Sequence, residues 1–236
     1  MSIPPNTMRY IFGIDYESIE YEIDTAFRLQ EETHADAQEY PYWTLLETNQ
    51  CACCPLKKAT HSHCPAAIRM HSVLEKFKRY DSIERVQLRV ETPQRNYEID
   101  CDLQSGLNSM LGLQMASSGC PVVGQLRSMT SFHLPVSTFA ETLYRVVSNY
   151  LTKQYFAYKS GESPDWDLKV LKDFFYTLEG LNQDFSDRIR TLEQKDAISN
   201  AMVMFFASSA VVAELIEDGL SEYKDFFTGE SAEAPY

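Results

Sequence analysis

The chain has 236 residues, of which 44% are hydrophobic and 23% are charged, with 9 glycines and 10 prolines. This composition is that of a folded protein with a core, and it excludes disordered, collagen-like and low-complexity chains. A net charge of −13 argues against broad binding to nucleic acid, because an acidic surface repels the phosphate backbone. Residues 51–100 form the one locally basic stretch, with 9 basic and 6 acidic groups, and they hold four of the six cysteines.

The first hundred residues show strand patterns. Residues 9–14 and 19–27 are short runs rich in aromatic and branched side chains, joined by a turn at 15–18, and they predict a hairpin. A further strand is predicted over 43–47. Residues 85–91 and 96–103 alternate apolar and polar side chains around a turn with Pro93, which predicts a second hairpin with one wet face.

One helix is predicted within this part, and helices are predicted for the rest of the chain. Pro65 is a suitable first helical residue, and apolar side chains recur after it at helical spacing. From residue 104 onward, apolar periodicity predicts a helix that ends before Gly119. A capping box at Thr138–Glu141 opens another helix, which Gly161 ends. Further helices are predicted to start at Ser163-Pro164, to lie near 181–192, and to run over 196–227.

These elements predict an α+β fold, in which a small antiparallel sheet with a cysteine-rich loop is followed by a C-terminal helical bundle. The expected division is a mainly β part with one helix over residues 1–103, a helical part packed on it over 104–228, and a flexible acidic tail over 229–236. Acidic side chains at Asp184, Asp187, Glu193 and Asp196 are expected on a wet face of the helical part.

The sequence shows no sign of export or membrane insertion. Its start lacks the basic and apolar regions of a signal peptide. The longest apolar stretch, residues 201–216, contains two serines and a glutamate and is shorter than the roughly 18 residues that a span requires. We therefore expect a cytoplasmic protein without a membrane partner, in which grouped cysteines serve as metal ligands more often than as disulfides.

The cysteines carry the strongest chemical signal. Cys51 and Cys54 have the C-x-x-C spacing that lets two thiolates of one loop reach the same metal centre. Cys64 and Cys120 follow at longer distances. Three cysteines, at positions 54, 64 and 120, are followed by proline, whereas the composition predicts only about 0.25 such pairs. A following proline stiffens the backbone and removes a competing amide donor, which suits a metal ligand.

Cys51, Cys54, Cys64 and Cys120 are therefore the predicted ligands. The proline excess favours an iron–sulfur cluster of the 4Fe–4S kind, because Cys-Pro closes the cysteine run of bacterial ferredoxins. Zinc is the alternative cofactor, since imidazole is an ordinary zinc ligand and His61 and His63 precede Cys64. The third alternative is that no metal binds and the cysteines pack as small hydrophobic side chains.

Four other residues are reserve candidates for metal ligands. Cys53, His61, His63 and His133 are candidate additional ligands, although a histidine such as His133 is more often a core residue with satisfied hydrogen bonds. Cys101 lies in an alternating strand and is expected in the core. No Walker loop, dinucleotide-binding glycine motif or nucleophile elbow is present, so no catalytic residue is assigned.

Five short motifs together resemble a family of bacterial proteins of unassigned function. They are Trp43-Thr-x-Leu, Cys51-x-x-Cys54-Pro-Leu, His63-Cys64-Pro-x-Ala, Ser118-Gly-Cys120-Pro and Phe132-His-Leu-Pro135. The resemblance runs over most of the chain and implies a bacterial, cytoplasmic origin. It also implies that the four cysteines act as a group, and it brings no activity with it.

Three kinds of function are consistent with these observations. The preferred one is a soluble metal-binding protein whose iron–sulfur cluster makes it a redox- or metal-responsive binding or regulatory module for a protein partner. The second is a structural zinc-binding adaptor, and the third is an enzyme that uses an open metal position or a reactive thiol. The balance leans away from an enzyme, and the sequence does not predict the oligomeric state.

Overall fold

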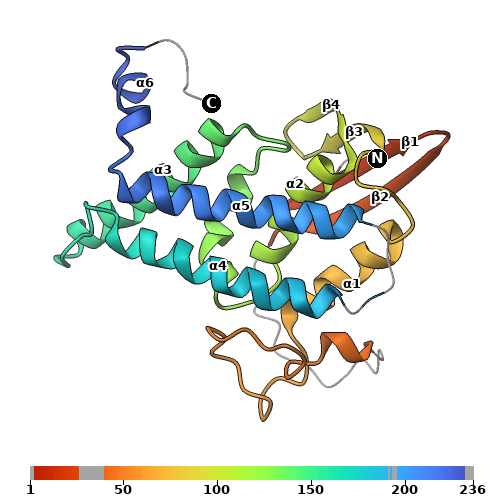
Figure 1. Cartoon of the computed structure of the whole chain (residues 1–236). Helices are drawn as coiled ribbons and strands as arrows, with labels where there is room; N and C mark the ends of the chain where they lie inside the picture. The colour runs from red at the N-terminus through yellow and green to blue at the C-terminus, as the bar shows by residue number, and fades with distance from the viewer. Residues whose placement is uncertain (1–2, 27–39, 191, 193–195, 232–236) are drawn as a thin grey trace.

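The computed structural model describes residues 3–26, 40–190, 192 and 196–231. A four-stranded antiparallel sheet in the order β2-β1-β3-β4 comes first in the chain, with one helix inserted into it, and helices make up the rest (Figure 1). The fold is α+β, as predicted. The strands are β1 (Thr7–Ile14), β2 (Glu17–Asp24), β3 (Arg85–Glu91) and β4 (Asn96–Asp102).

The helices are α1 (Pro65–Phe77), α2 (Leu103–Ala116), α3 (Phe139–Lys159), α4 (Lys169–Arg190), α5 (Ala197–Glu217) and α6 (Lys224–Thr228). Three 3-10 segments accompany them: η1 (Tyr42–Thr44), η2 (Val123–Phe132) and η3 (Ser221–Tyr223).

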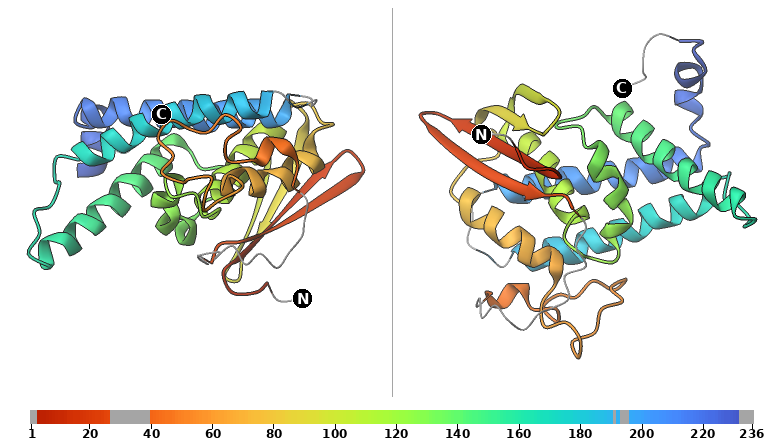
Figure 2. Two further views of the ribbon diagram at one scale, coloured as in Figure 1. Left: turned by 90° about the horizontal axis from the view of Figure 1, so that it is seen from below. Right: turned by 180° about the vertical axis from the view of Figure 1, so that it is seen from behind.

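Both predicted hairpins are present, and their alternating pattern sets the buried face of the sheet. Every second residue of β1 is buried, as are Val86, Leu88 and Val90 of β3. The buried face packs against α1 and α2, and α4 and α5 form a further layer beyond these helices (Figure 2). One continuous hydrophobic core joins residues of the sheet and of the helices. Phe27, the last residue of one predicted strand, lies outside the described residues.

Several boundaries differ from the predictions for local reasons. Residues 43–47 do not form a strand: η1 follows Pro41, and only Leu45 pairs, in an isolated bridge with His63. No helix starts at Ser163-Pro164, because Asp165 accepts hydrogen bonds from the first amides of α4, those of Lys169 and Val170.

The two helices predicted between 163 and 192 are one helix, α4, which continues through Gly180. The single segment predicted over 196–227 is broken into α5, η3 and α6, because Leu220 takes a left-handed conformation with a φ of 57°. The predicted helix starts at Pro65 and at the Thr138 capping box are confirmed, as is the left-handed Gly119 after α2. Residues 232–236 of the predicted tail lie outside the described part.

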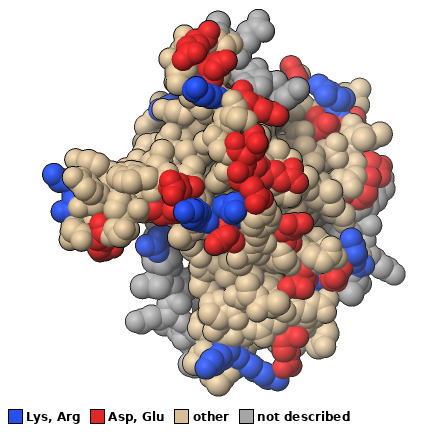
Figure 3. All heavy atoms as spheres, turned by 60° about the vertical axis from the view of Figure 1, so that its left-hand side comes forward, with Lys and Arg blue, Asp and Glu red and all other residues tan. Residues whose placement is uncertain are grey.

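The helix α5 is long and apolar enough, by length and composition alone, to cross a membrane, and 39% of its apolar window is buried inside the protein. It packs against α2 and α4, so its apolar character is partly used in the core. On the face drawn in Figure 3, acidic side chains are widely spread, and lysine and arginine side chains lie in several separate places.

Two glycines predict opposite effects of an added methyl group. A Cβ at Gly106 of α2 would lie 2.8 Å from the ring of buried Phe12, so we expect Gly106→Ala to destabilise the fold by about 1–3 kcal/mol. A Cβ at Gly180 of α4 would meet nothing within 4 Å, so Gly180→Ala should stabilise by about 0.5–1 kcal/mol. Urea unfolding of both variants measures the two changes, and equal shifts would contradict the predicted close contact of α2 with the sheet.

Candidate functional site

The four predicted ligands converge on one place. Cys51, Cys54, Cys64 and Cys120 together line a small cavity of about 20 Å³, whose other walls are apolar residues of α1, α2, α4 and the connecting segments. The thiols come from three segments: the loop that follows η1, the residue before α1, and the turn after α2. All six cysteines of the chain are free thiols. The fold thus brings residues up to 69 positions apart in the sequence to one cavity, while their role as metal ligands stays a prediction.

The start of α1 fixes Cys64. This residue is the N-cap of the helix, its backbone is extended, and its amide donates a 2.8 Å hydrogen bond to the carbonyl of Thr44. Pro65 occupies the first helical position and has no amide hydrogen to satisfy. Burial raises the pKa of the Cys64 thiol, while the amides of Ala67 and Ala66 act in the opposite direction. The helix start therefore places the thiol and offsets part of the effect of burial, which disfavours its ionised form.

Two other short segments hold the remaining thiols. The amide of Cys54 donates to the carbonyl of Cys51 over 2.9 Å, which closes the C-x-x-C turn. The turn rests against α4, because the amide of Ala52 donates to the carboxylate of Asp184 over 2.9 Å. Cys120 follows the left-handed Gly119 at the end of α2, and it is buried.

A buried arginine, Arg188 of α4, anchors the cysteine loop. Its side chain is 1% exposed, and its guanidinium donates to the backbone carbonyls of Trp43 and Leu45 over 2.9 and 2.6 Å. It also donates to Leu46 and Asn49 over 3.2 and 3.4 Å. Backbone carbonyls that cannot reach water are costly to leave unpaired, so one side chain here satisfies much of the loop.

Arg188 also contributes to the electrostatics of the cavity. Burial is the main cause that raises the pKa of Cys51 to about 12 and that of Cys120 to about 11, and neighbouring cysteines contribute to both values. Cys64 and Cys54 act on Cys120, which indicates that the thiols are close enough to affect one another's ionisation. The positive charge of Arg188 lowers the pKa of Cys64. The positive charge of this guanidinium would offset part of the negative charge of a Cys64 thiolate.

The sequence did not single out Arg188, and it placed Asp184 on a wet face. Asp184 is half-buried and binds the cysteine loop. Asp196 is exposed, as predicted, and its carboxylate accepts hydrogen bonds from the amide and hydroxyl of Ser82 at 2.8 and 3.0 Å. Asp187 is exposed and pairs with Arg190, as a wet face requires. Glu193 lies outside the described residues.

The reserve ligands do not line the cysteine cavity. His61 and His63 are engaged locally, with ring nitrogens 3.0 and 2.8 Å from the hydroxyls of Thr60 and Ser62. Cys53 is partly buried beside the cavity, and Cys101 is buried in β4. Among the described residues, no three histidine, cysteine, aspartate or glutamate side chains are grouped so that they could hold a metal ion as they stand.

His133 belongs to a different part of the protein. Its Nε2 lies 2.6 Å from the hydroxyl of Tyr10 and 3.3 Å from that of Ser109. Burial lowers the pKa of His133 to about 3, and the positive charge of Arg145 adds to the effect. The imidazole is therefore neutral near pH 7 and makes hydrogen bonds within the core, so it is not a fifth ligand for the cysteine cavity.

The lowered pKa of His133 predicts a loss of stability in mild acid. In the unfolded chain His133 has a pKa of about 6.5 and binds a proton below that pH, whereas in the folded protein it does so only near pH 3. Stability therefore falls as the pH decreases, by about 2 kcal/mol between pH 7 and pH 5. His133→Gln keeps hydrogen-bonding groups and should remove most of this decrease in urea unfolding curves. An equally steep decrease in the variant would contradict the buried neutral histidine.

Comparisons with known proteins add one finding. Neither the curated proteins nor the solved structures gave a match to this chain. A family match, in contrast, extends over residues 7–228 and includes the sheet, the cysteine cavity and all the helices described above. The chain therefore belongs to the family described as Domain of unknown function (DUF6901).

Proposed function

We propose that the protein binds a metal centre through Cys51, Cys54, Cys64 and Cys120, and that this centre is an iron–sulfur cluster. The observation that carries the proposal is the convergence of these four thiols, from three separate segments, on a single cavity. Free cysteines that serve only as small hydrophobic side chains have no reason to meet in one place. Cys101, which is buried alone in β4, is the example of such a residue in this chain.

The donor set supports this choice of metal. Among the described residues no carboxylate or imidazole lines the cavity, and an all-thiolate set is the soft environment that iron–sulfur clusters and structural zinc prefer. His61 and His63 hydrogen-bond to neighbouring hydroxyls and do not line the cavity, so their positions lend no support to a mixed cysteine and histidine zinc site. Cys51 and Cys54 are partly exposed and lie on a loop, so they are the ligands best able to adjust to the centre.

The position of the cavity supports a role in regulation. When bound, an iron–sulfur cluster supplies reversible one-electron chemistry. Leu181 and Phe185 of α4 line the cavity, and Asp184 and Arg188 of the same helix bind the loop that carries two of the ligands. A change in the charge of the site therefore acts directly on α4, which packs along α5. We infer that the protein is a redox-responsive binding module and that the helical part contacts its protein partner.

The test is elemental analysis with an optical spectrum of protein purified without oxygen. The proposal expects iron and acid-labile sulfide bound to the chain, with broad absorption in the visible range that is bleached by reduction. A colourless protein with one zinc ion would replace the cluster by the structural zinc alternative. In that case, removal of zinc by a chelator should lower the melting temperature. Protein without any metal, prepared under the same conditions, would overturn both readings.

The regulatory part of the proposal has its own measurement. Hydrogen exchange of the α4 amides should differ between the oxidised and reduced protein, because Arg188 and Asp184 connect this helix to the loop of Cys51 and Cys54. Exchange that is identical in both states would leave a metal-binding protein without a redox response.

A further inference from the structure

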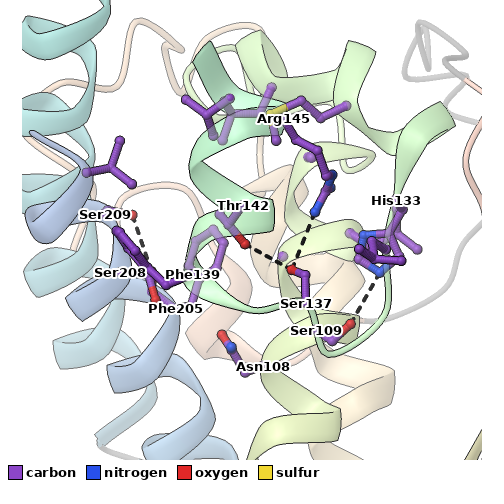
Figure 4. Close-up of a pocket in the computed structure, with 18 of the residues that line it drawn as sticks. Asn108, Ser109, His133, Ser137, Phe139, Thr142, Arg145, Phe205, Ser208 and Ser209 are labelled. Atoms are coloured by element: carbon purple, nitrogen blue, oxygen red, sulfur yellow. Dashed lines mark hydrogen bonds between the residues drawn. The ribbon is translucent and has the colours of Figure 1, made fainter. Parts of the chain in front are cut away.

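A second, larger cavity lies between the helices, away from the cysteines. Its volume is about 320 Å³, which falls in the range of small-molecule binding sites. Figure 4 shows it enclosed by α2, by η2 and the segment that follows, by α3 and by α5. At the roughly 30 Å³ that a water molecule occupies in the liquid, the cavity has space for about ten non-hydrogen atoms.

The two ends of this cavity differ in chemistry. Toward α5 and α4 the walls are apolar, with Val212, Phe205 and Phe175 among them. Two serines of α5 also line this side, but their hydroxyls donate to carbonyls of their own helix and are satisfied there. Toward the start of α3 the walls carry Ser137 and Arg145, whose side chains point toward one another in Figure 4, and Ser109, which points toward His133. The cavity is therefore amphipathic, with its polar groups at one end.

Arg145 is the charged group at the polar end, and it lacks a carboxylate partner. The side chain is half-buried, and this burial lowers the pKa of its guanidinium while the charge of Glu141 raises it. Its one hydrogen bond to a described residue is a long one, 3.5 Å to the hydroxyl of Ser137, and its Nε is buried without a partner. Glu141, one turn earlier in α3, accepts instead from the amide and the hydroxyl of Thr138 in the capping box.

Glu141 of the same helix acts on Arg145 through its negative charge, but no ion pair joins Arg145 to a described carboxylate. Neither this cavity nor a neighbouring one of about 380 Å³ has an aspartate or glutamate among its lining residues, although the chain carries 34 acidic residues. The two cavities share Thr130, His133, Leu134 and Arg145, and the second one adds Arg95. A desolvated cation left unpaired in this way is unfavourable on its own, so the arrangement calls for an anionic partner.

We propose that this cavity binds a small amphipathic monocarboxylate, with the carboxylate at Arg145 and the apolar chain directed toward α5. Guanidinium groups bind carboxylates through paired, charge-assisted hydrogen bonds, and the hydroxyls of Ser137 and Thr142 stand next to it as further donors. The volume fits an acid of about eight carbons. This inference is independent of the metal centre, because no cysteine lines either cavity.

Three ligands of equal chain length test the proposal on the unmodified protein. Calorimetric titration with octanoate, 1-octanol and octylammonium separates the contribution of the negative head group from that of the apolar chain. Octanoate is expected to bind at least tenfold more tightly than octanol, since a hydrogen bond to a charged group contributes that much. Octylammonium should bind most weakly. Equal affinity for the three ligands, or binding of none, would overturn the proposal.

Arg145→Gln and Ser208→Phe locate the binding site, and Lys159→Gln is the matched control. Arg145→Gln should abolish the preference for octanoate over octanol, whereas Lys159→Gln, an equal charge change at the exposed end of α3, should keep it. Ser208→Phe places a ring in the apolar end and should remove the binding of both ligands. Thermal melting confirms that each variant is folded. An octanoate preference that persists in a folded Arg145→Gln protein, or octanoate binding that Ser208→Phe leaves unchanged, would place the ligand elsewhere.

Discussion

Replacement of Arg188 by methionine is expected to lower the free energy of unfolding by about 3–4 kcal/mol. Methionine retains much of the volume of the side chain but donates no hydrogen bonds, so the carbonyls of Trp43 and Leu46 lose the guanidinium as donor, while that of Leu45 keeps the amide of Thr48. Each carbonyl that stays buried and unpaired costs about 1–3 kcal/mol, and partial access of water to the loop keeps the total below the full sum. Urea unfolding monitored by circular dichroism measures the change.

Arg190→Met is the matched control. This side chain lies two residues further on, is exposed, and forms only a surface ion pair with Asp187 in the described part of the chain. Such pairs contribute little, so a change within about 0.5 kcal/mol is expected. If Arg188→Met were as stable as Arg190→Met, Arg188 would not be the anchor of the cysteine loop.

Cys64→Ser and Cys120→Ser are each expected to remove most of the bound metal. Both positions are buried on the cavity wall, and a serine hydroxyl is a poor substitute for a thiolate toward iron or zinc. The fold should survive, because serine is nearly isosteric with cysteine and is a favourable N-cap at position 64, where α1 begins. Metal content per chain, measured after purification without oxygen, reports the loss.

Cys53→Ser and Cys101→Ser provide the comparison. Neither residue lines the cavity, so both variants should retain the metal at the level of the unmodified protein. A loss in Cys53→Ser that equals the loss in Cys64→Ser would mean that Cys53 is a ligand, and the set of four would need to be revised. Retention of the metal in every variant would contradict the cysteine centre altogether.

Much of the fold could be predicted because its signals are local. Alternation in residues 85–91 and 96–102, the proline at the start of α1 and the capping box before α3 each act within a few residues. The errors arose where a distant or unusual contact decides the conformation. The stretch after Pro41 has strand composition, but its carbonyls bind Arg188, more than 140 residues away, and it forms a 3-10 turn instead.

The candidate site, like the fold, could be predicted from the sequence only where a local signal marks its residues. Proline after a cysteine leaves a mark in the sequence, and the four cysteines it helped to group line one cavity in the structure. Asp184 and Arg188 left none: they are charged residues four apart on an amphipathic helix, a pattern that usually belongs to the exposed face. Arg145 was missed for a similar reason, since its desolvation depends on η2 and α2 lying against α3.

The end of α2 separates the two cavities by the width of a single helix. Met115 is part of the cysteine cavity, while Leu113 and Ala116, its near neighbours in sequence, face the larger one. Because α2 is a rigid rod within the core, a rotation or shift that enlarges one cavity displaces a wall of the other. If the proposed metal centre and the proposed carboxylate both bind, such a movement would link their occupancy. The factor by which the metal centre changes carboxylate affinity would then equal the factor by which carboxylate changes metal affinity.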